Sequence, residues 1–419
     1  MEVHNVYLGV LDHLDAAGVR YAVLHGWESL AKGDVSDIDL IVSFHDLSRV
    51  ESALRECYRI LNVFQYEAAS FGFVLSPREG DPSSTLVADF STDYRWRGRI
   101  FFTDEELLQS RQRWLGYWVA GPAQEFAYLL VKKIYEKGTI PAQQRTRIEQ
   151  LAQCLGPEAE GSVFRLFGRL RGKRLIDWIR HQRWTQIEAH VPELRQCLRR
   201  QILKRDYLNP LRYWKAEIGR VWTRWCHPSG LSVVVAGVHG KEEMTLVRGL
   251  QSIPHAFRRI VTLETAPPPN GRSSQASSLR RVHQLLRSAL TSQIRLRMLV
   301  VRSALVILKG NNCDLLGNGN RKNTLSRLIR YLIPKADLVF TIGAPGSPLS
   351  SQEQGSVREL TKGTHQPLGR QQVVVLNHRL PEEQFSRDAR EALADFLCRR
   401  YAAYRHLWFP GQTFAAHIK

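Results

Sequence analysis

A chain of 419 residues is too long for one domain of ordinary size, and its net charge of +19 indicates an anionic partner such as a nucleotide, nucleic acid, sugar phosphate or acidic membrane. Its six cysteines have neither Cys-x-x-Cys spacing nor metal-ligand spacing to histidine, which argues against a zinc site or a disulfide framework and favours a reducing cytoplasm. No apolar run approaches the roughly 20 residues of a membrane helix, and no signal-peptide pattern is present, so we expect a soluble or peripheral protein.

Apolar spacing in the first ninety residues predicts one helix and three strands. The helical repeat runs from Val3 to Leu14, and Gly18 ends it. Strands are expected at 21–24, 37–42 and 86–90. This alternation predicts an α/β fold.

Acidic side chains mark two of these strands. Asp37 and Asp39 are two residues apart, so on a strand they share one face at a separation of about 6 to 7 Å. Asp89 lies in the later strand. Carboxylates at this spacing suit a pair of Mg²⁺ ions about 4 Å apart, which can activate an attacking oxygen and stabilise a leaving one. Asp-x-Asp also occurs in turns and on solvated strands, so the surroundings decide between these interpretations.

Two further patterns follow, an alternation of arginines and the start of a helix. Arg95, Arg97 and Arg99 alternate, which on one strand would give either a stripe for a phosphate-bearing acceptor or an exposed face. A helix is expected to begin at Pro122, with Glu125 near the positive end of its dipole.

Residues from about 5 to 155 resemble the nucleotidyltransferase superfamily. Its pattern is an apolar strand, a glycine, a small residue, a loop, Asp-x-Asp and a third acid on a later strand. The Gly26-Trp27 pair before the Asp-x-Asp also looks like the aminoglycoside-nucleotidyltransferase branch. Trp27 departs from the family, because it replaces the small residue that packs against the triphosphate.

The resemblance implies roles for individual residues. Asp37 and Asp39 would bind Mg²⁺, and Asp89 would complete the metal site and act as base toward the attacking hydroxyl. A lysine on the helix that follows, Lys132 or Lys133, would reach the triphosphate, although paired lysines on a helix are often simply solvated. The substrate would be a nucleoside triphosphate, bound near Gly26 and Trp27.

The composition changes to Arg, Trp and Leu between residues 156 and 228, which predicts amphipathic helices with cationic outer faces. Such faces suit nucleic acid or an anionic membrane, or they form the solvated surface of a helical connector. The stretch from Trp222 to Trp225 is expected to pack this connector against the next domain.

The C-terminal part predicts a three-layer α/β domain with a mainly parallel sheet, because apolar strands alternate with helical stretches. The expected strands are 231–236, 258–264, 304–308, 337–342 and 371–376.

The turn after the first of these strands has the frame of a phosphate-binding loop but not its residues. Gly237, Gly240, Lys241 and a late Thr245 remain, while Glu243 occupies the position of the lysine. Like charge beside phosphate is unfavourable.

Residues from about 230 to 410 nevertheless resemble the thymidylate-kinase-like domains fused behind nucleotidyltransferase-like domains in bacterial polysaccharide gene clusters. Segment 334–340 matches the family's Pro-x-x-Asp-Leu strand. Lys309 and Gly310 replace the acid and arginine of its Asp-Arg-Tyr motif, and no lid arginine is evident between 347 and 354. The resemblance therefore implies a pseudokinase without kinase activity.

Three domains are thus predicted: a nucleotidyltransferase-like domain over 1–155, a basic helical connector over 156–228, and a thymidylate-kinase-like domain over 229–419. The predicted function is Mg²⁺-dependent nucleotidyl transfer to a hydroxyl or phosphate of a small acceptor in surface polysaccharide biosynthesis. The alternative is a non-catalytic scaffold or regulator of glycan production. An RNA-end nucleotidyltransferase is supported only by the basic connector.

Overall fold

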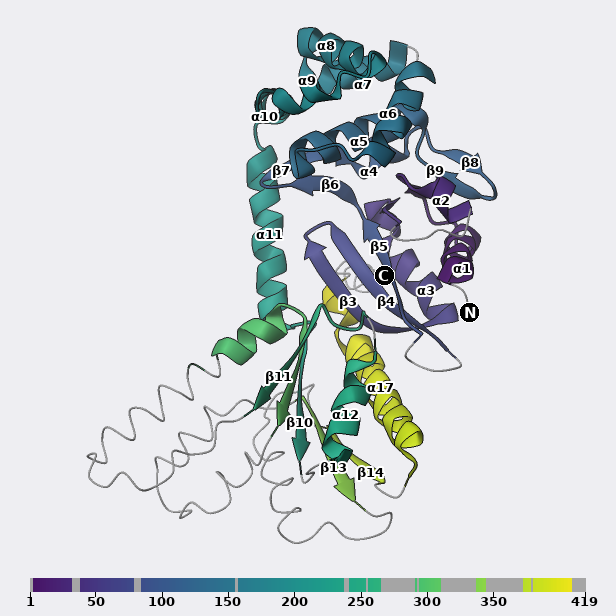
Figure 1. The fold of residues 1–419 in the computed structure, drawn as a ribbon, viewed down its shortest axis with the longest axis vertical. Helices are drawn as coiled ribbons and strands as arrows, with labels where there is room; N and C mark the ends of the chain where they lie inside the picture. Colours follow the sequence, from purple (N-terminus) through teal and green to yellow (C-terminus); the bar gives the residue numbers. More distant parts are fainter. Residues whose placement is uncertain are drawn as a thin grey trace, which may run out of the picture.

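The computed structural model of the chain is an α/β structure built on two large sheets, with a two-stranded third one (Figure 1). The described residues are 3–31, 38–78, 84–154, 157–236, 241–253, 255–264, 291, 294–309, 337–343, 372–377 and 380–408. One large sheet has seven strands of mixed direction and the other large sheet has five parallel strands, which confirms the expected α/β class. None of the helices in these ranges combines the length and apolar character needed to cross a membrane.

The mixed sheet has the strand order β3-β4-β5-β2-β1-β9-β8. Its strands are β1 (Tyr21–Val23), β2 (Leu40–Val42), β3 (Tyr58–Glu67), β4 (Ser70–Pro77), β5 (Leu86–Ser91), β8 (Gln112–Trp114) and β9 (Tyr117–Val119). Strand β2 is antiparallel to β1 and parallel to β5.

Helices α1 (Val3–Ala16) and α3 (Leu47–Cys57) supply residues to the core on one face of this sheet, where Leu11 and Val50 pack with Leu40 and Phe90. The opposite face supplies Ile41 to a second core. The shorter elements are α2 (Trp27–Ala31), η1 (Phe44–Asp46), the hairpin strands β6 (Asp93–Trp96) and β7 (Arg99–Thr103), and α4 (Asp104–Leu108).

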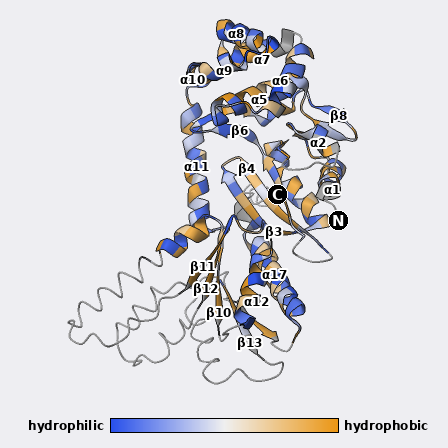
Figure 2. Cartoon of the chain, viewed as in Figure 1, coloured by the Kyte–Doolittle hydropathy of each residue, from blue (hydrophilic) through white to orange (hydrophobic). Residues whose placement is uncertain are grey.

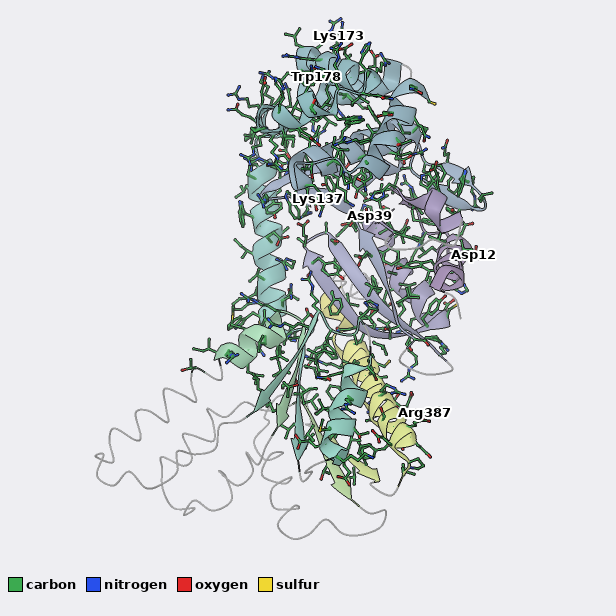
Figure 3. All side chains as sticks on the ribbon, in the orientation of Figure 1. Asp12, Asp39, Lys137, Lys173, Trp178 and Arg387 are labelled. Carbon is green, nitrogen blue, oxygen red and sulfur yellow. The ribbon has the colours of Figure 1, made fainter. Side chains whose placement is uncertain are left out.

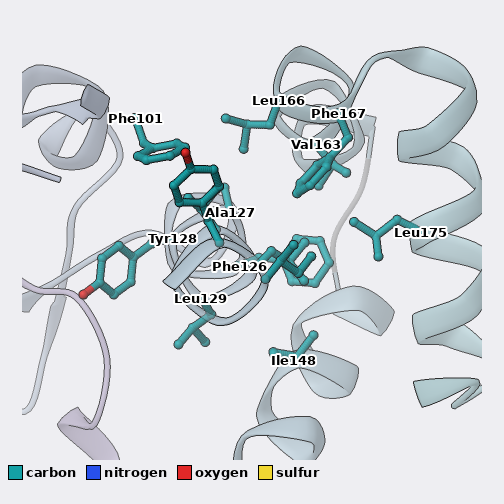
Figure 4. Packing of buried hydrophobic residues seen from close by; sticks show 14 of the residues in the cluster. Phe101, Phe126, Ala127, Tyr128, Leu129, Ile148, Val163, Leu166, Phe167 and Leu175 are labelled. Carbon is teal, nitrogen blue, oxygen red and sulfur yellow. The ribbon is translucent and has the colours of Figure 1, made fainter. Parts of the chain in front are cut away.

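A run of helices follows the mixed sheet. It comprises α5 (Pro122–Val131), the π-turn η2 (Lys132–Lys137), α6 (Ala142–Cys154), α7 (Pro157–Phe167), α8 (Arg169–Arg180), α9 (Trp184–Ala189), α10 (Val191–Arg205) and α11 (Asn209–Cys226). Phe126 of α5 is buried with Ile148, Val163 and Leu175 of the helices around it (Figure 4). Because α5 also contributes to the core beneath Ile41, it joins the helices to the sheet.

Many cations of these helices are paired with acids on the surface. Arg171 lies 2.8 Å from Glu193, and Arg180 lies 3.1 Å from Glu160. Such exposed pairs contribute little stability, typically about 0–1 kcal/mol each.

The parallel sheet has the order β11-β12-β10-β13-β14. Its strands are β10 (Leu231–Ala236), β11 (Arg259–Glu264), β12 (Ala304–Lys309), β13 (Leu338–Gly343) and β14 (Gln372–Asn377). All five were predicted to within one residue at each end. Figure 2 shows these strands as largely apolar, as expected of a sheet whose core includes residues of helices α12 (Lys241–Gln251) and α17 (Glu382–Trp408).

Strand β3 belongs to the cores of both halves. Ile60 and Val63 pack in the core of the mixed sheet, whereas Leu61 and Phe64 pack with residues of the parallel sheet. Arg59, on the same strand, forms 2.6 Å ion pairs with two acids of α17. The two halves therefore share buried apolar surface.

One local expectation is wrong. The three arginines do not form one strand stripe, because Arg97 lies at a hairpin turn with φ of 41° and Arg95 is buried against Asp93.

The stretch from Trp222 to Trp225 contacts the C-terminal half, as expected. The buried Arg224 donates a 3.1 Å hydrogen bond to Ser303, and the Arg297 guanidinium lies 5.8 Å from the Trp225 ring. The Trp222 side chain is exposed.

We predict that Asn62→Leu lowers the free energy of unfolding by about 1–3 kcal/mol, because the buried Asn62 amide donates to the carbonyl oxygens of Ser229 at 2.8 Å and Ala256 at 3.0 Å. Denaturant titration measures the change. Gln186→Leu, at an exposed position of α9, is the matched control and should have little effect. An unchanged midpoint for Asn62→Leu would show that this bridge between the halves does not stabilise the fold.

Candidate functional site

Asp39 lies immediately before β2, where the mixed sheet faces α5 (Figure 3). Leu24 N donates to Asp39 O at 2.9 Å, which extends the β1–β2 pairing by one residue. Ile41 packs in the core under α5, while Leu40 and Val42 pack in the core on the other face. Because side chains alternate along a strand, Asp39 shares the α5 face with Ile41.

Asp89 lies beside Asp39 on the same face. Leu40 of β2 is in register with Phe90 of the parallel β5, so the residues before them, Asp39 and Asp89, are neighbours with backbones about 5 Å apart. Phe90 shares the core of Leu40, which puts Asp89 on the opposite face with Asp39.

Gly72 of β4 is paired with Asp89 and leaves room for its side chain. A Cβ at Gly72 would lie only 2.7 Å from Asp89 Oδ1. The structure therefore brings together two of the three acids predicted from the sequence. The third, Asp37, lies outside the described residues.

One oxygen of Asp39 is the centre of a polar cluster. His25 Nε2 lies 2.7 Å from Asp39 Oδ2, and the Tyr128 hydroxyl donates to the same oxygen at 3.2 Å. The Lys132 ammonium also donates to Oδ2, and its Nζ lies 3.3 Å from His25 Nε2. A carboxylate only accepts hydrogen bonds, so Nε2 is the ring nitrogen that carries the hydrogen here.

The cluster favours the ionised form of Asp39. Burial alone would raise the pKa of Asp39, but the hydrogen bond from His25 and the positive charge of Lys132 outweigh burial and hold that pKa below its ordinary value. Burial and the Asp39 charge raise the pKa of Tyr128 well above its ordinary value. At neutral pH the site therefore pairs a carboxylate with a neutral phenol that donates to it.

Helix α5 and the turn after it position the two donors from the helical side. Tyr128 and Lys132 are four residues apart, so they lie on one side of the helix, toward the sheet. Pro122 fits the first turn of α5. The π-turn Lys132–Lys137 ends at Gly138, whose φ of 79° suits glycine.

The two lysines predicted as alternatives have different surroundings. Lys132 is directed at Asp39, whereas Lys133 is buried and burial, together with the charge of Lys132, lowers the pKa of its ammonium. Lys132 is thus the lysine in contact with the site.

Gly26 and Trp27 form the turn into α2. Gly26 has a φ of 81°, which favours glycine. The Trp27 ring is buried, 4.4 Å from the ring of Trp114 and 4.8 Å below the Arg147 guanidinium. Its bulk therefore packs in the core, so the indole does not itself occupy the region around Asp39.

The acids at this site suit a hard cation. Carboxylate oxygens of Asp39 and Asp89 are the ligand type that Mg²⁺ prefers, and Lys132 already places a positive charge on Asp39. A magnesium ion at Asp39 Oδ2 would take the place of that ammonium. Within the described ranges, which exclude Asp37, no group of three His, Cys, Asp or Glu side chains is close enough to hold a metal.

The loop expected to resemble a phosphate-binding loop is only partly described, because Gly237 and Gly240 lie outside the described residues. The same holds for Gly310 and for the segment 347–354, where no lid arginine was expected. Lys241 and Thr245 of α12 both contact Glu382 of α17, with Lys241 Nζ 3.3 Å from one carboxylate oxygen and the Thr245 hydroxyl 3.0 Å from the other. Both groups therefore bind a protein carboxylate.

Sequence reasoning missed His25 and Tyr128. His25 lies just after β1, which pairs with β2, the strand that Asp39 precedes. The sequence signal that could have identified His25 is a polar residue before a glycine at the end of a strand. Tyr128 stands in an apolar helical run and gives no such signal, because only the packing of α5 directs its hydroxyl toward the sheet.

No known protein-family model matches the chain, and no curated protein is significantly similar to it in sequence.

We predict that Asp39→Asn lowers the free energy of unfolding by about 1–3 kcal/mol at pH 7, because it removes the charged acceptor shared by His25 and Lys132. The pKa of Asp39 is depressed in the folded state, so this stabilisation is present above the ordinary carboxyl pKa and is lost as the pH falls through the folded value. The difference from wild type should therefore shrink below about pH 4 in denaturant titrations.

Asp12→Asn is the control, because Asp12 is an exposed acid on α1. A wild-type advantage that stays constant from pH 7 to pH 3 would contradict the charged role of Asp39.

Proposed function

We propose that the N-terminal half is a Mg²⁺-dependent nucleotidyltransferase site that acts on a hydroxyl or phosphate of a small acceptor. The observation that carries this proposal is the placement of Asp39 and Asp89 side by side on one face, with the Lys132 ammonium on the Asp39 carboxylate. A mixed sheet with adjacent acids is what the resemblance to nucleotidyltransferases implies. The role in surface polysaccharide biosynthesis rests on that resemblance alone.

The charges support an exchange of partners at Asp39. Magnesium, when bound, would activate the attacking oxygen and offset the charge of the phosphates. Lys132 would then leave Asp39 and hold a phosphate oxygen, since an ammonium is a compact cation on a flexible stem. Tyr128 and His25 would keep the Asp39 carboxylate oriented. Asp89 would accept the proton of the acceptor hydroxyl.

A second candidate is nucleotide binding without turnover, as in a scaffold or regulator. Its specific support is the convergence of three donors on one oxygen of Asp39, which satisfies the carboxylate without a metal.

The C-terminal half, in this proposal, is a pseudokinase that transfers no phosphoryl group. Phosphoryl transfer depends on cations positioned around the phosphates. Lys241, which follows the loop residues in sequence, instead pairs with Glu382, which also accepts a hydrogen bond from Thr245.

We predict that the protein binds a nucleoside triphosphate with Mg²⁺ and that Lys132→Gln weakens this binding about ten- to one-hundredfold, the usual consequence of losing one charge-assisted contact. Asp39→Asn should abolish the Mg²⁺ dependence. Calorimetric titration with each common nucleoside triphosphate, with and without Mg²⁺, measures both effects.

Lys137→Gln is the matched control, because Lys137 lies on the same π-turn but is exposed and paired with Glu136. Pyrophosphate release in the presence of an acceptor separates the two candidates. Binding without release would favour the non-catalytic one, and Mg²⁺-dependent binding that is equal for wild type and Asp39→Asn would contradict the catalytic one.

A further inference from the structure

Helix α11 is amphipathic in the opposite sense to most helices of a globular protein. Its inner face is polar and its outer face is apolar. Asn209, Tyr213, Glu217 and Arg224 are buried on the inner side. These four positions lie within about 80° of one another on a helical wheel, which defines a single inward side.

The polar inner face attaches the helix to both halves of the molecule. The amide of Asn209 exchanges two 3.0 Å hydrogen bonds with the backbone of Ile100 in β7. Glu217 accepts from Ala68 N, at the β3–β4 turn, at 2.7 Å. Arg224 donates to Ser303, beside the parallel sheet. Hydrogen bonds thus hold α11 in place, so its apolar side chains are not needed for packing.

The outer face presents a continuous apolar stripe to solvent. Leu211, Ile218 and Trp222 are 66, 67 and 69% exposed. The full stripe, about 100° wide, is Leu211, Trp214, Ile218, Val221, Trp222 and Trp225. The 18 residues of α11 extend over about 27 Å, and exposed Tyr207 and Leu208 precede the helix. A contiguous apolar patch of this kind marks an interaction surface.

Cations accompany this stripe. Exposed Arg212, which pairs with Asp206 at 3.2 Å, and exposed Lys215 lie along one flank, and the Arg297 guanidinium lies 5.8 Å from the Trp225 ring at the other end. Lys215 has no ion-pair partner in the described part of the chain. The only acid on the helix, Glu217, faces inward. The outward face is therefore apolar and cationic.

We propose that this face of α11 binds the surface of an anionic lipid bilayer. A helix lying in the interface uses Trp and aliphatic side chains at the level of the headgroups and Lys and Arg against their phosphates. Three tryptophans, three aliphatic residues and flanking cations match that chemistry, and the chain's net charge of +19 adds long-range attraction. In Figure 1, α11 lies along one side of the molecule, opposite α1.

Flotation with vesicles tests the proposal on the full-length protein. We expect binding to vesicles of phosphatidylcholine mixed with phosphatidylglycerol, much weaker binding to phosphatidylcholine alone, and weakening by salt. Ile218→Gln with Trp222→Gln should reduce partitioning to the anionic vesicles about tenfold or more. Lys215→Gln should reduce it less and make it less sensitive to salt.

Leu115→Gln with Leu170→Gln is the matched control, because both leucines are exposed apolar residues outside α11. Since the substituted side chains point to solvent, both double variants should keep the wild-type melting temperature. Absence of binding to anionic vesicles, or an equal loss in the control, would overturn the proposal. So would a dimer in sedimentation that Ile218→Gln with Trp222→Gln dissociates, because a second copy would then cover the stripe.

Discussion

Alternation of side chains along β2 and β5 is the constraint on which the candidate site depends. Leu40 and Phe90 fill the core under α1 and α3, so the residues before them must point to the other face. Both of the preceding residues, Asp39 and Asp89, are acids. Because the two strands are parallel and Leu40 is in register with Phe90, these acids lie at the same level of the sheet. A slip of one residue in either strand would bury an acid and separate the pair. The hydrophobic core thus sets the position of the two carboxylates.

The helical layer supplies the opposite charge. Helix α5 buries Phe126 and its neighbours in the core of the helical layer while it directs Tyr128 and Lys132 at Asp39. The same apolar packing that holds this layer to the sheet therefore places an ammonium on the carboxylate. In the proposed function, a metal ion would replace this internal cation on Asp39. At the other side of the molecule, polar contacts of α11 hold both halves and leave its apolar side chains free for a partner.

Local patterns predicted the elements better than their contacts. The five parallel strands, the first helix and the start of α5 follow from apolar periodicity and from Gly and Pro positions, which are local signals. The β3–β4 hairpin was missed because β3 is buried on both sides by cores from distant parts of the chain and shows no simple alternation. The inward side of α11 does not follow from apolar periodicity, because buried hydrogen bonds of Glu217 and Arg224 with distant parts of the chain determine its orientation.

The central claim is that Lys132 gives up Asp39 to a metal ion and moves to a phosphate. A crystal structure with Mg²⁺ and a nucleoside triphosphate analogue that cannot be cleaved at the α-phosphate measures this directly. The account predicts a metal ion on Asp39 and Asp89, with Lys132 Nζ on a phosphate oxygen and no longer on Asp39. A structure in which the nucleotide binds elsewhere while Lys132 stays on Asp39 would contradict it.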